Sequence, residues 1–280
     1  MLEVVDLFKE RDTRDELGLG AVRDSFADQF FPGTSTIMTR ARYFLIVPWT
    51  YQRLENKQVE SDQIADRARR AETELIEVIA RSSDKKGNIG KYAKTTLKRL
   101  PSSVYWQGLG IWGIRAYAGS QAQYHRSLDR YYTLASRHGR RLVERDVEHD
   151  DLIAPNWHAG LVPPSTKFPE KCSLRLSRSE AEYLSERIQL SPICAGSLLA
   201  ELVANRKRLD PIDFCWQHPH IAAFPAALKE RLLHAQNFSE LMHGAALLYN
   251  LILAEENKWA DGTSKYRAFF SGWTRVFAER

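Results

Sequence analysis

The fold is most clearly indicated by the stretch Ser120-QAQYHRSLDRYYTLASRHGRR-Leu142. At about 100° of helical rotation per residue, its apolar side chains lie within about 40° of one direction. These side chains are Tyr124, Leu128, Tyr131, Ala135 and Leu142. The opposite side carries almost only arginine, at Arg126, Arg130, Arg137, Arg140 and Arg141. Because Ser120 is a typical N-cap residue, the pattern predicts an amphipathic helix with a packing face and a cationic face.

Helical signals continue on both sides of this stretch, and strand signals are weak. Residues 59 to 81 predict a long amphipathic helix, and Ser177 with Glu180 predicts a capping box at the start of another. Two helices are expected within residues 226 to 257, followed by a final helix with an aromatic stripe. No alternation of period two extends beyond a few residues. We therefore predict a mainly α, multi-helix globular protein.

Three local boundaries follow from proline and serine positions. A helix is expected from Thr34 or Ser35 to Leu45, closed by Pro48. A short helix ending before Pro101 would place Lys91, Lys94 and Lys98 on one face. After Leu190, the dipeptide Ser191-Pro192 predicts a helix start, with the helix continuing to Asn205.

The division of the chain is predicted from its composition. Residues 1–145 form an N-terminal helical half that carries the basic, aromatic stretch. Residues 146–172 are acidic and proline-rich with little periodicity, which is typical of a connector. Residues 173–280 form a C-terminal helical half. With 280 residues, of which 44% are hydrophobic, the chain is long enough to bury a full core.

The composition also predicts where in the cell the protein is found. The longest apolar run, Tyr43 to Trp49, is far too short to cross a bilayer, so we expect no membrane partner. Acids stand near the N-terminus where a signal peptide would carry basic residues, which favours a cytoplasmic location. Three widely spaced cysteines are typical of reduced thiols, not of a disulfide framework or a zinc site.

The strongest functional signal is the charge of residues 85–145. This segment holds thirteen Lys or Arg against two acids, a local net charge of +11 in a chain whose total is +5. Eight aromatic residues are interleaved with the cations. Such a segment is typical of a protein that binds nucleic-acid phosphates, and we expect one continuous positive surface. The predicted contacts are Lys91, Lys94, Lys98, Arg99, Arg126, Arg130, Arg137 and Arg141, with Trp106 and Tyr132 as base-stacking residues if they are exposed.

A second candidate for phosphate binding precedes the apolar run. Thr34 and Ser35 begin a predicted helix, and Arg40 and Arg42 follow one turn later, so backbone N–H groups and guanidinium groups could hold a phosphate. The alternative is that these side chains cap the helix and pair with local acids, which is the commoner use of such residues.

No catalytic signature is found, so neither a catalytic residue nor a cofactor or metal is predicted. Gly108-Leu-Gly-Ile-Trp-Gly113 matches the dinucleotide-binding letters, but a preceding strand and a βαβ unit are missing. His218 and His220 lack the spacing of a zinc site. The acids from Glu144 to Asp151 could hold Mg²⁺, although acids beside a basic helix are more often solvated counter-charges. Two alternatives to nucleic-acid binding thus stay open: a non-enzymatic subunit that docks on an acidic protein, and, with less support, a metal-dependent nuclease.

Several short motifs resemble a bacterial family of unknown function over nearly the whole chain. They are Phe31-Pro-Gly-Thr-Ser-Thr36, Thr39-Arg-Ala-Arg-Tyr43, Pro101-Ser-Ser-Val-Tyr-Trp106, Trp157-His158 and His243-Gly-Ala-Ala-Leu-Leu-Tyr-Asn250. Members of that family have no assigned activity and are somewhat longer at the C-terminus. Some are encoded beside helicases and other genes of antiviral defence. The resemblance implies an accessory subunit that handles DNA or RNA, with proteins of the same gene cluster as further partners. It supplies no catalytic residue.

Overall fold

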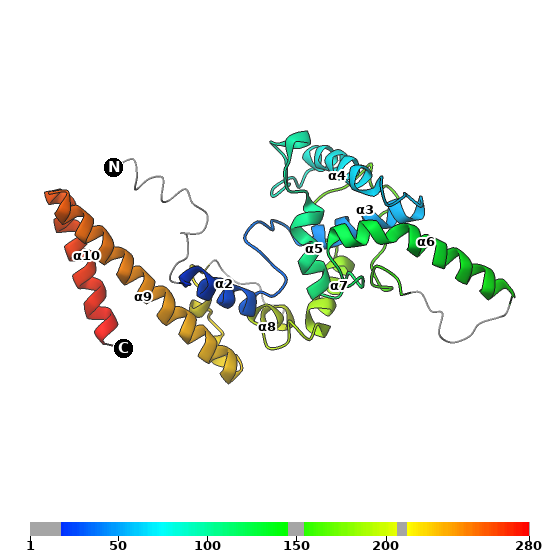
Figure 1. Cartoon of the computed structure of the whole chain (residues 1–280). Coiled ribbons are helices and arrows are strands. Elements are labelled where there is room, and N and C mark those ends of the chain that lie inside the picture. Colours follow the sequence, from blue (N-terminus) through cyan, green and yellow to red (C-terminus); the bar gives the residue numbers. More distant parts are fainter. Residues whose placement is uncertain (1–17, 145–153, 206–211, 280) are drawn as a thin grey trace. The chain divides into compact units, whose positions relative to one another are not determined.

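The computed structural model describes residues 18–144, 154–205 and 212–279, without the side chains of 137–144. Within these ranges the secondary structure is helical. The α-helices are α2 (Leu19–Phe30), α3 (Tyr43–Asn56), α4 (Ile64–Ala80), α5 (Pro101–Ile111), α6 (Gln121–Glu144), α7 (Arg178–Leu190), α8 (Leu198–Asn205), α9 (Ala226–Glu256) and α10 (Ala260–Ala278) (Figure 1). Short 3₁₀ helices are η2 (Lys94–Thr96), η3 (Cys215–Gln217) and η4 (Ile221–Ala223). The described residues form no β-strand, only an isolated antiparallel bridge between Arg115 and Trp157. The predicted mainly α class is confirmed.

Two compact units make up the chain. One consists of Met1–Ala27 together with Lys207–Arg280, and the other of Asp28–Arg206. The division therefore does not fall at residues 146–172, where composition predicted a connector. The described part of that segment, from residue 154 onward, belongs to the larger unit, and Asn156, Trp157 and Cys172 are buried in it. In the described part of this segment, the weak sequence periodicity therefore reflects irregular backbone packed within the larger unit.

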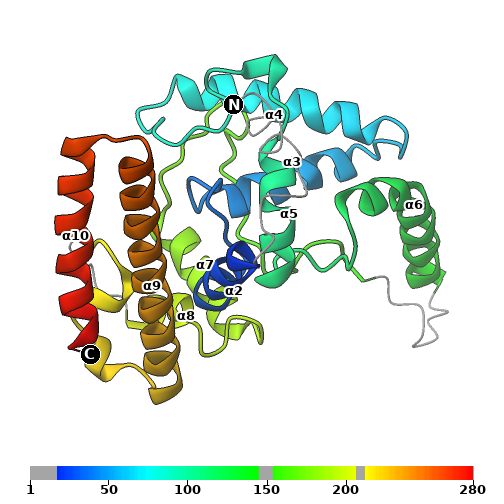
Figure 2. The same cartoon turned by 60° about the vertical axis from the view of Figure 1, so that its left-hand side comes forward.

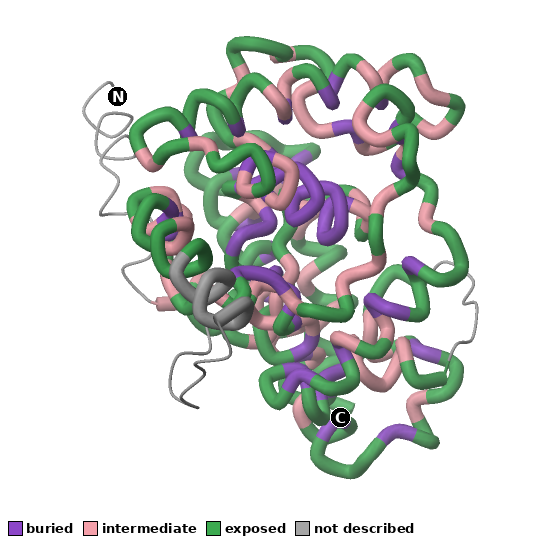
Figure 3. Tube along the Cα trace, turned by 90° about the vertical axis from the view of Figure 1, so that its right-hand side faces the viewer, coloured by how far each residue is buried: buried purple, intermediate pink, exposed green. Residues whose placement is uncertain are grey.

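Helix α3 is the centre of the larger unit. Ten of its fourteen residues are buried, because the run from Tyr43 to Tyr51 presents apolar side chains in every direction. The buried residues packed around α3 come from α4, α5, α6, α7 and the loops between them, and buried residues are purple in Figure 3. The prediction that Pro48 would end this helix is wrong. The helix begins only at Tyr43, and Pro48 lies inside it at the cost of one backbone hydrogen bond. Packing on all sides outweighs that local cost.

Helix α5 packs closely against the turn at Gly33. A Cβ atom placed on Gly108 would lie 2.1 Å from the carbonyl oxygen of Gly33. On the same side, Trp112 stacks on Phe44 at 3.8 Å between ring centroids and donates a 2.9 Å hydrogen bond to the Pro32 carbonyl. Gly108 thus serves close packing of backbone on backbone, and the described chain has no strand before this segment, as a dinucleotide-binding motif would require.

The two faces predicted for α6 are confirmed over its first half. Ser120 and Gln123 form a reciprocal cap, since the Ser120 hydroxyl accepts from the Gln123 amide at 3.2 Å and the Gln123 side chain accepts from the Ser120 amide at 2.8 Å. Tyr124 and Leu128 are buried, whereas Arg126 and Arg130 are exposed. Farther along, Ala135 is exposed, so the packing face extends only to the half-buried Tyr131 and Tyr132.

Helix α7 begins with the predicted capping box. The Ser177 hydroxyl accepts from the Glu180 amide at 3.2 Å, and the Glu180 carboxylate accepts from the Ser177 amide at 2.8 Å. The next helix, in contrast, starts later than predicted. Residues after Ser191 form turns closed by Cys194 and Ser197, and α8 begins only at Leu198.

The smaller unit is built on a helical hairpin. Helix α9 is continuous over 31 residues, so the predicted break near Gln236 does not occur. Helix α10 runs beside it, as Figure 2 shows. Trp273 packs directly on Gly244, where a Cβ atom would come within 2.2 Å of the indole, and its Nε1 donates to the Glu240 carbonyl at 3.0 Å. None of the helices in the described part of the chain combines the length and hydrophobicity needed to span a bilayer.

Candidate nucleic-acid interface

The first group of predicted contacts lies in a loop, Gly90–Arg99, which we call the basic loop. The predicted short helix is wrong, because the loop contains only the 3₁₀ turn of η2. Gly90 and Lys94 adopt left-handed backbone angles, with φ of 81° and 45°, and these angles interrupt any α-helix. Lys91, Lys94 and Lys98 therefore do not share a helical face.

The base of the basic loop is tied to the core. The buried Asn88 side chain donates to the Ile76 carbonyl at 2.8 Å and accepts from the Tyr43 hydroxyl at 3.2 Å. That hydroxyl also accepts from the Ile89 amide at 3.0 Å. At the other end of the loop, Arg69 of α4 donates to the Leu97 carbonyl at 3.1 Å. Both ends of the loop are thereby positioned while its cationic side chains face outward.

All four predicted cations of the basic loop are exposed. Within the described ranges, Lys91, Lys94, Lys98 and Arg99 form no salt bridge with an acid. Lys85 and Lys86, just before the loop, are exposed as well. No carboxylate of the described chain neutralises these groups, so they contribute positive potential at this surface.

The second group lies on α6 and comprises Arg126 and Arg130. Both are exposed, and neither is paired with an acid of the described chain. The one acid between them, Asp129, instead accepts from the Ser61 amide at 2.9 Å, and its own amide donates to the Ser61 hydroxyl at 3.1 Å. The Arg137 and Arg141 side chains lie outside the described residues.

These two groups lie at different positions along α4, and the described surface between them is not purely positive, contrary to the expectation from sequence. Helix α6 is attached at Ser61, just before α4, whereas the basic loop contacts α4 at Arg69 and Ile76. Arg69 and Ile76 are five and twelve residues beyond Ile64, the first residue of α4, which corresponds to roughly 8–18 Å along the helix. Both cartoons show α6 near the beginning of α4 and the basic loop farther along it (Figures 1 and 2). Between the groups, α4 exposes both arginines and acids.

Trp106 does not meet the condition set for a stacking residue. Its side chain is only 7% exposed, and its Nε1 donates to the Gly119 carbonyl at 2.9 Å. The guanidinium of Arg115 lies 4.8 Å from its ring centroid. Tyr132 is half-buried and donates to the Val59 carbonyl at 3.1 Å. The exposed aromatic residue of the stretch is Tyr92, at 91%.

Residues of the second candidate phosphate site form hydrogen bonds and ion pairs within the protein. The Thr34 hydroxyl donates to the Phe31 carbonyl at 2.8 Å, in a turn outside any α-helix. Arg40 pairs with Asp84 at 2.5 Å, and Arg42 pairs with Glu180 at 2.6 Å. No contact places Ser35 with these arginines. Both guanidinium groups are thus paired with acids, as in the alternative explanation, but these acids lie 44 and 138 residues away in the chain and are not local.

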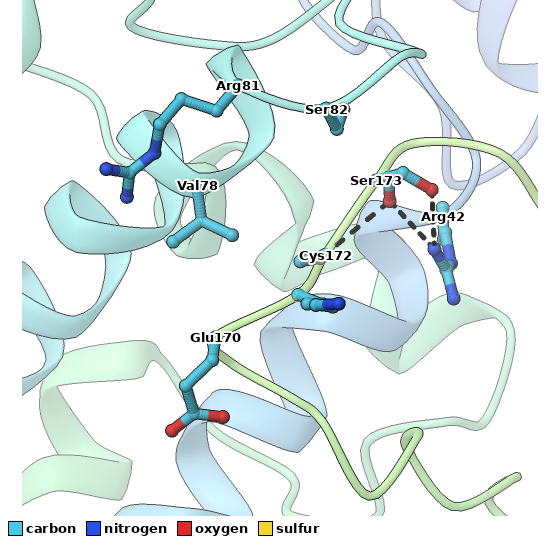
Figure 4. A pocket seen from close by; sticks show the side chains of 8 residues that line it. Arg42, Val78, Arg81, Ser82, Glu170, Cys172 and Ser173 are labelled. Atoms are coloured by element: carbon cyan, nitrogen blue, oxygen red, sulfur yellow. Dashed lines mark hydrogen bonds between the residues drawn. The ribbon is translucent and has the colours of Figure 1, made fainter.

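Arg42 also borders a cavity of about 460 Å³ between α4 and residues 170–173 (Figure 4). The Arg42 guanidinium turns toward Ser173, to which it donates at 2.8 Å, and away from Arg81 and Glu170. Burial raises the pKa of the Cys172 thiol at this cavity to about 11, so the thiol is protonated at neutral pH. The lining thus combines both charge signs with an inert thiol.

Two carboxyl groups that the sequence did not single out as site residues, the half-buried Glu55 and the buried Glu72, join the helices around α3. One oxygen of Glu55 accepts from the Tyr124 hydroxyl, from Asn156 at 3.0 Å and from the Trp157 indole at 3.0 Å. The second carboxylate, Glu72, accepts from the Ser102 amide at 2.8 Å, and burial raises its pKa to about 7. Their partners lie 30 to 102 residues away in the chain, so no local pattern could have identified them.

The described residues contain no group of three or more His, Cys, Asp or Glu that could hold a metal ion. The Nδ1 atom of His218 accepts from the His220 amide at 3.1 Å, which is a local turn contact. The acidic run from Glu144 to Asp151 lies outside the residues whose side chains are described.

The fold and the surface define a helical protein with two groups of exposed, unpaired cations on one unit. The chain belongs to the Family of unknown function (DUF6361), whose family model matches residues 2–267. Neither a curated protein nor a solved structure matches the chain.

Proposed function

We propose that this chain is a non-enzymatic accessory protein that binds DNA or RNA through phosphate contacts. The observation that supports the proposal is the excess of cations over acids in residues 85–145, and several of these cations are exposed and unpaired in the described chain. Arg40, Arg42 and Arg267 are held by carboxylates, whereas the exposed cations of the basic loop and of α6 have no acid partner in the described chain. Surface arginines and lysines that only keep a protein soluble are usually mixed with acids.

Phosphate contacts of this kind supply affinity without reading sequence. Each contact releases condensed counterions, so the logarithm of the association constant falls with the logarithm of the salt concentration. The expected slope is about −0.9 per contact for a duplex and about −0.7 for a single strand. A salt titration therefore counts the cations that bind phosphates.

The experiment is a gel-shift or anisotropy titration of mixed DNA and RNA against salt. The variant Lys91→Glu/Lys98→Glu/Arg99→Glu should weaken binding and reduce the slope by about 2.7 for duplex DNA. The control variant, Lys57→Glu/Lys167→Glu/Arg175→Glu, makes the same change in net charge at exposed positions outside both cation groups. Equal losses in the two variants would mean that only total charge matters, which contradicts a specific interface.

The same samples separate the remaining explanations. Absence of binding to either nucleic acid at low salt would contradict the proposal and favour docking on an acidic protein. Cleavage of the probe on addition of Mg²⁺ would contradict the non-enzymatic part. A role in bacterial antiviral defence belongs to the proposal through the family resemblance, and its test is whether deletion of the gene reduces resistance to phage.

A further inference from the structure

We propose that the basic loop binds single-stranded nucleic acid, with Tyr92 stacking on a base and the neighbouring cations contacting the phosphates on either side. This inference rests on the proposed function and adds the class of nucleic acid and the residue that selects it. It is carried by the exposure of one tyrosine, by its position among unpaired cations and by the anchoring of the loop.

Tyr92 differs from the other aromatic residues of the basic stretch. Its side chain is 91% exposed, whereas Tyr105, Trp106, Trp112 and Tyr124 are buried in the core. The remaining three, at positions 117, 131 and 132, are half-buried. A single exposed aromatic residue is unremarkable on a protein surface, so exposure alone would carry nothing.

The position of Tyr92 among unpaired cations makes its exposure relevant to binding. Lys91, Lys94, Lys98 and Arg99 lie within seven residues of Tyr92, and none has an acid partner in the described chain. The Lys91 ammonium lies 5.2 Å from the centroid of the Tyr92 ring. Proteins that bind single strands combine these two elements, a cationic track for the backbone and an aromatic ring on which a base stacks.

The loop holds Tyr92 in a defined place. Tyr92 is the middle residue of a turn closed by a 2.7 Å hydrogen bond from the Lys94 amide to the Gly90 carbonyl. Gly90 packs so tightly that a Cβ atom there would come within 2.7 Å of Leu97 and 2.8 Å of Ile76. A turn fixed to the core in this way holds the Tyr92 backbone in place, which reduces the backbone entropy lost on binding.

The same geometry favours a single strand over a duplex. In a duplex the base faces are stacked on one another, so an isolated tyrosine ring cannot reach them without unstacking a base pair. The basic loop also contains no α-helix that could enter a major groove. In a single strand each base offers a free face, and stacking is independent of sequence because every base has such a face.

The test is fluorescence anisotropy with three labelled probes of equal length: oligothymidylate, the same oligomer with abasic sites, and a mixed-sequence duplex. Tyr92→Ala should weaken binding to oligothymidylate on the order of 10-fold, and Tyr92→Phe should retain the wild-type affinity because the ring is kept. Neither variant should change binding to the abasic oligomer or the duplex. Tyr249→Ala, which removes another exposed tyrosine, is the control.

The outcomes distinguish this inference from the proposed function. If Tyr92→Ala binds oligothymidylate like the wild type while the triple reversal in the basic loop still weakens binding, the stacking inference is overturned and phosphate binding stands. If Tyr92→Ala weakens all three probes equally, the ring does not act by stacking, and the inference is likewise overturned. If the wild type binds none of the probes, the proposed function itself is contradicted.

Discussion

Arg42 and Glu180 form an ion pair of 2.6 Å whose two side chains are 15% and 7% exposed. The same carboxylate completes the capping box of α7 by accepting from the Ser177 amide. One residue thus ties the segment before α3 to the start of a helix 138 residues away. Since the pair is nearly buried, removal of one partner would leave an uncompensated charge in the core.

Arg42→Ala should therefore lower the free energy of unfolding by about 3–5 kcal/mol, measured by urea denaturation. The matched control is Arg178→Ala, which breaks the exposed Arg178–Glu182 pair and should change stability by less than about 1 kcal/mol. Similar small effects of both substitutions would mean that Arg42 is not held by a buried pair.

Substitutions on the two faces of α6 should have different effects: those on the cationic face should weaken binding, and those on the packing face should lower stability. Reversal of charge at Arg126, Arg130 and Arg137 should weaken nucleic-acid binding by more than roughly 100-fold at low salt, because phosphate contacts supply the sequence-independent affinity. The melting temperature should hardly change, since the two described arginines are exposed and surface substitutions usually fall within about 0.5 kcal/mol. Leu128→Ala, on the fully buried opposite face, should cost about 2–5 kcal/mol.

Unfolding of the triple variant would show that these arginines are structural. Unchanged binding together with unchanged stability would show that the cationic face of α6 takes no part in the interface. The first measurement is thermal denaturation followed by circular dichroism, and the second is the salt titration described above.

Substitution by alanine should change the stability of the protein in opposite directions at Gly108 and at Gly272. Helix propensity alone predicts that Gly→Ala within a helix stabilises by up to about 1 kcal/mol. Gly272→Ala on α10 should follow that rule, because a Cβ atom there meets nothing within 4 Å. Gly108→Ala should instead destabilise by more than about 2 kcal/mol, since its Cβ atom would lie 2.1 Å from the Gly33 carbonyl and backbone would have to move. Equal shifts in denaturation midpoint would contradict the close approach.

Glu72 should make stability depend on pH in the direction opposite to an ordinary salt-bridged acid. Desolvation raises its pKa to about 7 in the folded state, although hydrogen bonds from Ser102 and the charge of Arg69 act against the shift. The folded protein therefore binds more protons than the unfolded chain between about pH 4.5 and 7, and the contribution of this group to stability is lost as pH rises through 7.

Urea denaturation at a series of pH values tests this sign. Relative to the wild type, Glu72→Gln should become progressively more stable between pH 5 and 8, by up to about 3 kcal/mol. The difference between the two proteins, not either curve alone, isolates this group from other titrating residues. A difference that is constant with pH would show that Glu72 titrates normally.

The family assignment, the helical class, the two faces of α6 and the caps at Ser120 and Ser177 could be predicted from the sequence. Each of these structural features depends on residues within a few positions of one another, so spacing determines the contacts that form. The excess of positive charge between residues 85 and 145 is likewise a property of composition. These signals are the basis of the proposal that the partner is a nucleic acid.

Only the tertiary structure decided which side chains are exposed and which are paired. Trp106 is covered by Arg115 and by the core, while Tyr92 stands free on a turn, and nothing in the local sequence distinguishes them. Arg40 and Arg42 are neutralised by acids 44 and 138 residues away, and Pro48 stays inside α3 because packing on all sides outweighs one lost hydrogen bond. The physical reason is the same in each case: burial and ion pairing depend on distances between segments that are far apart in the chain, and a linear pattern does not contain those distances.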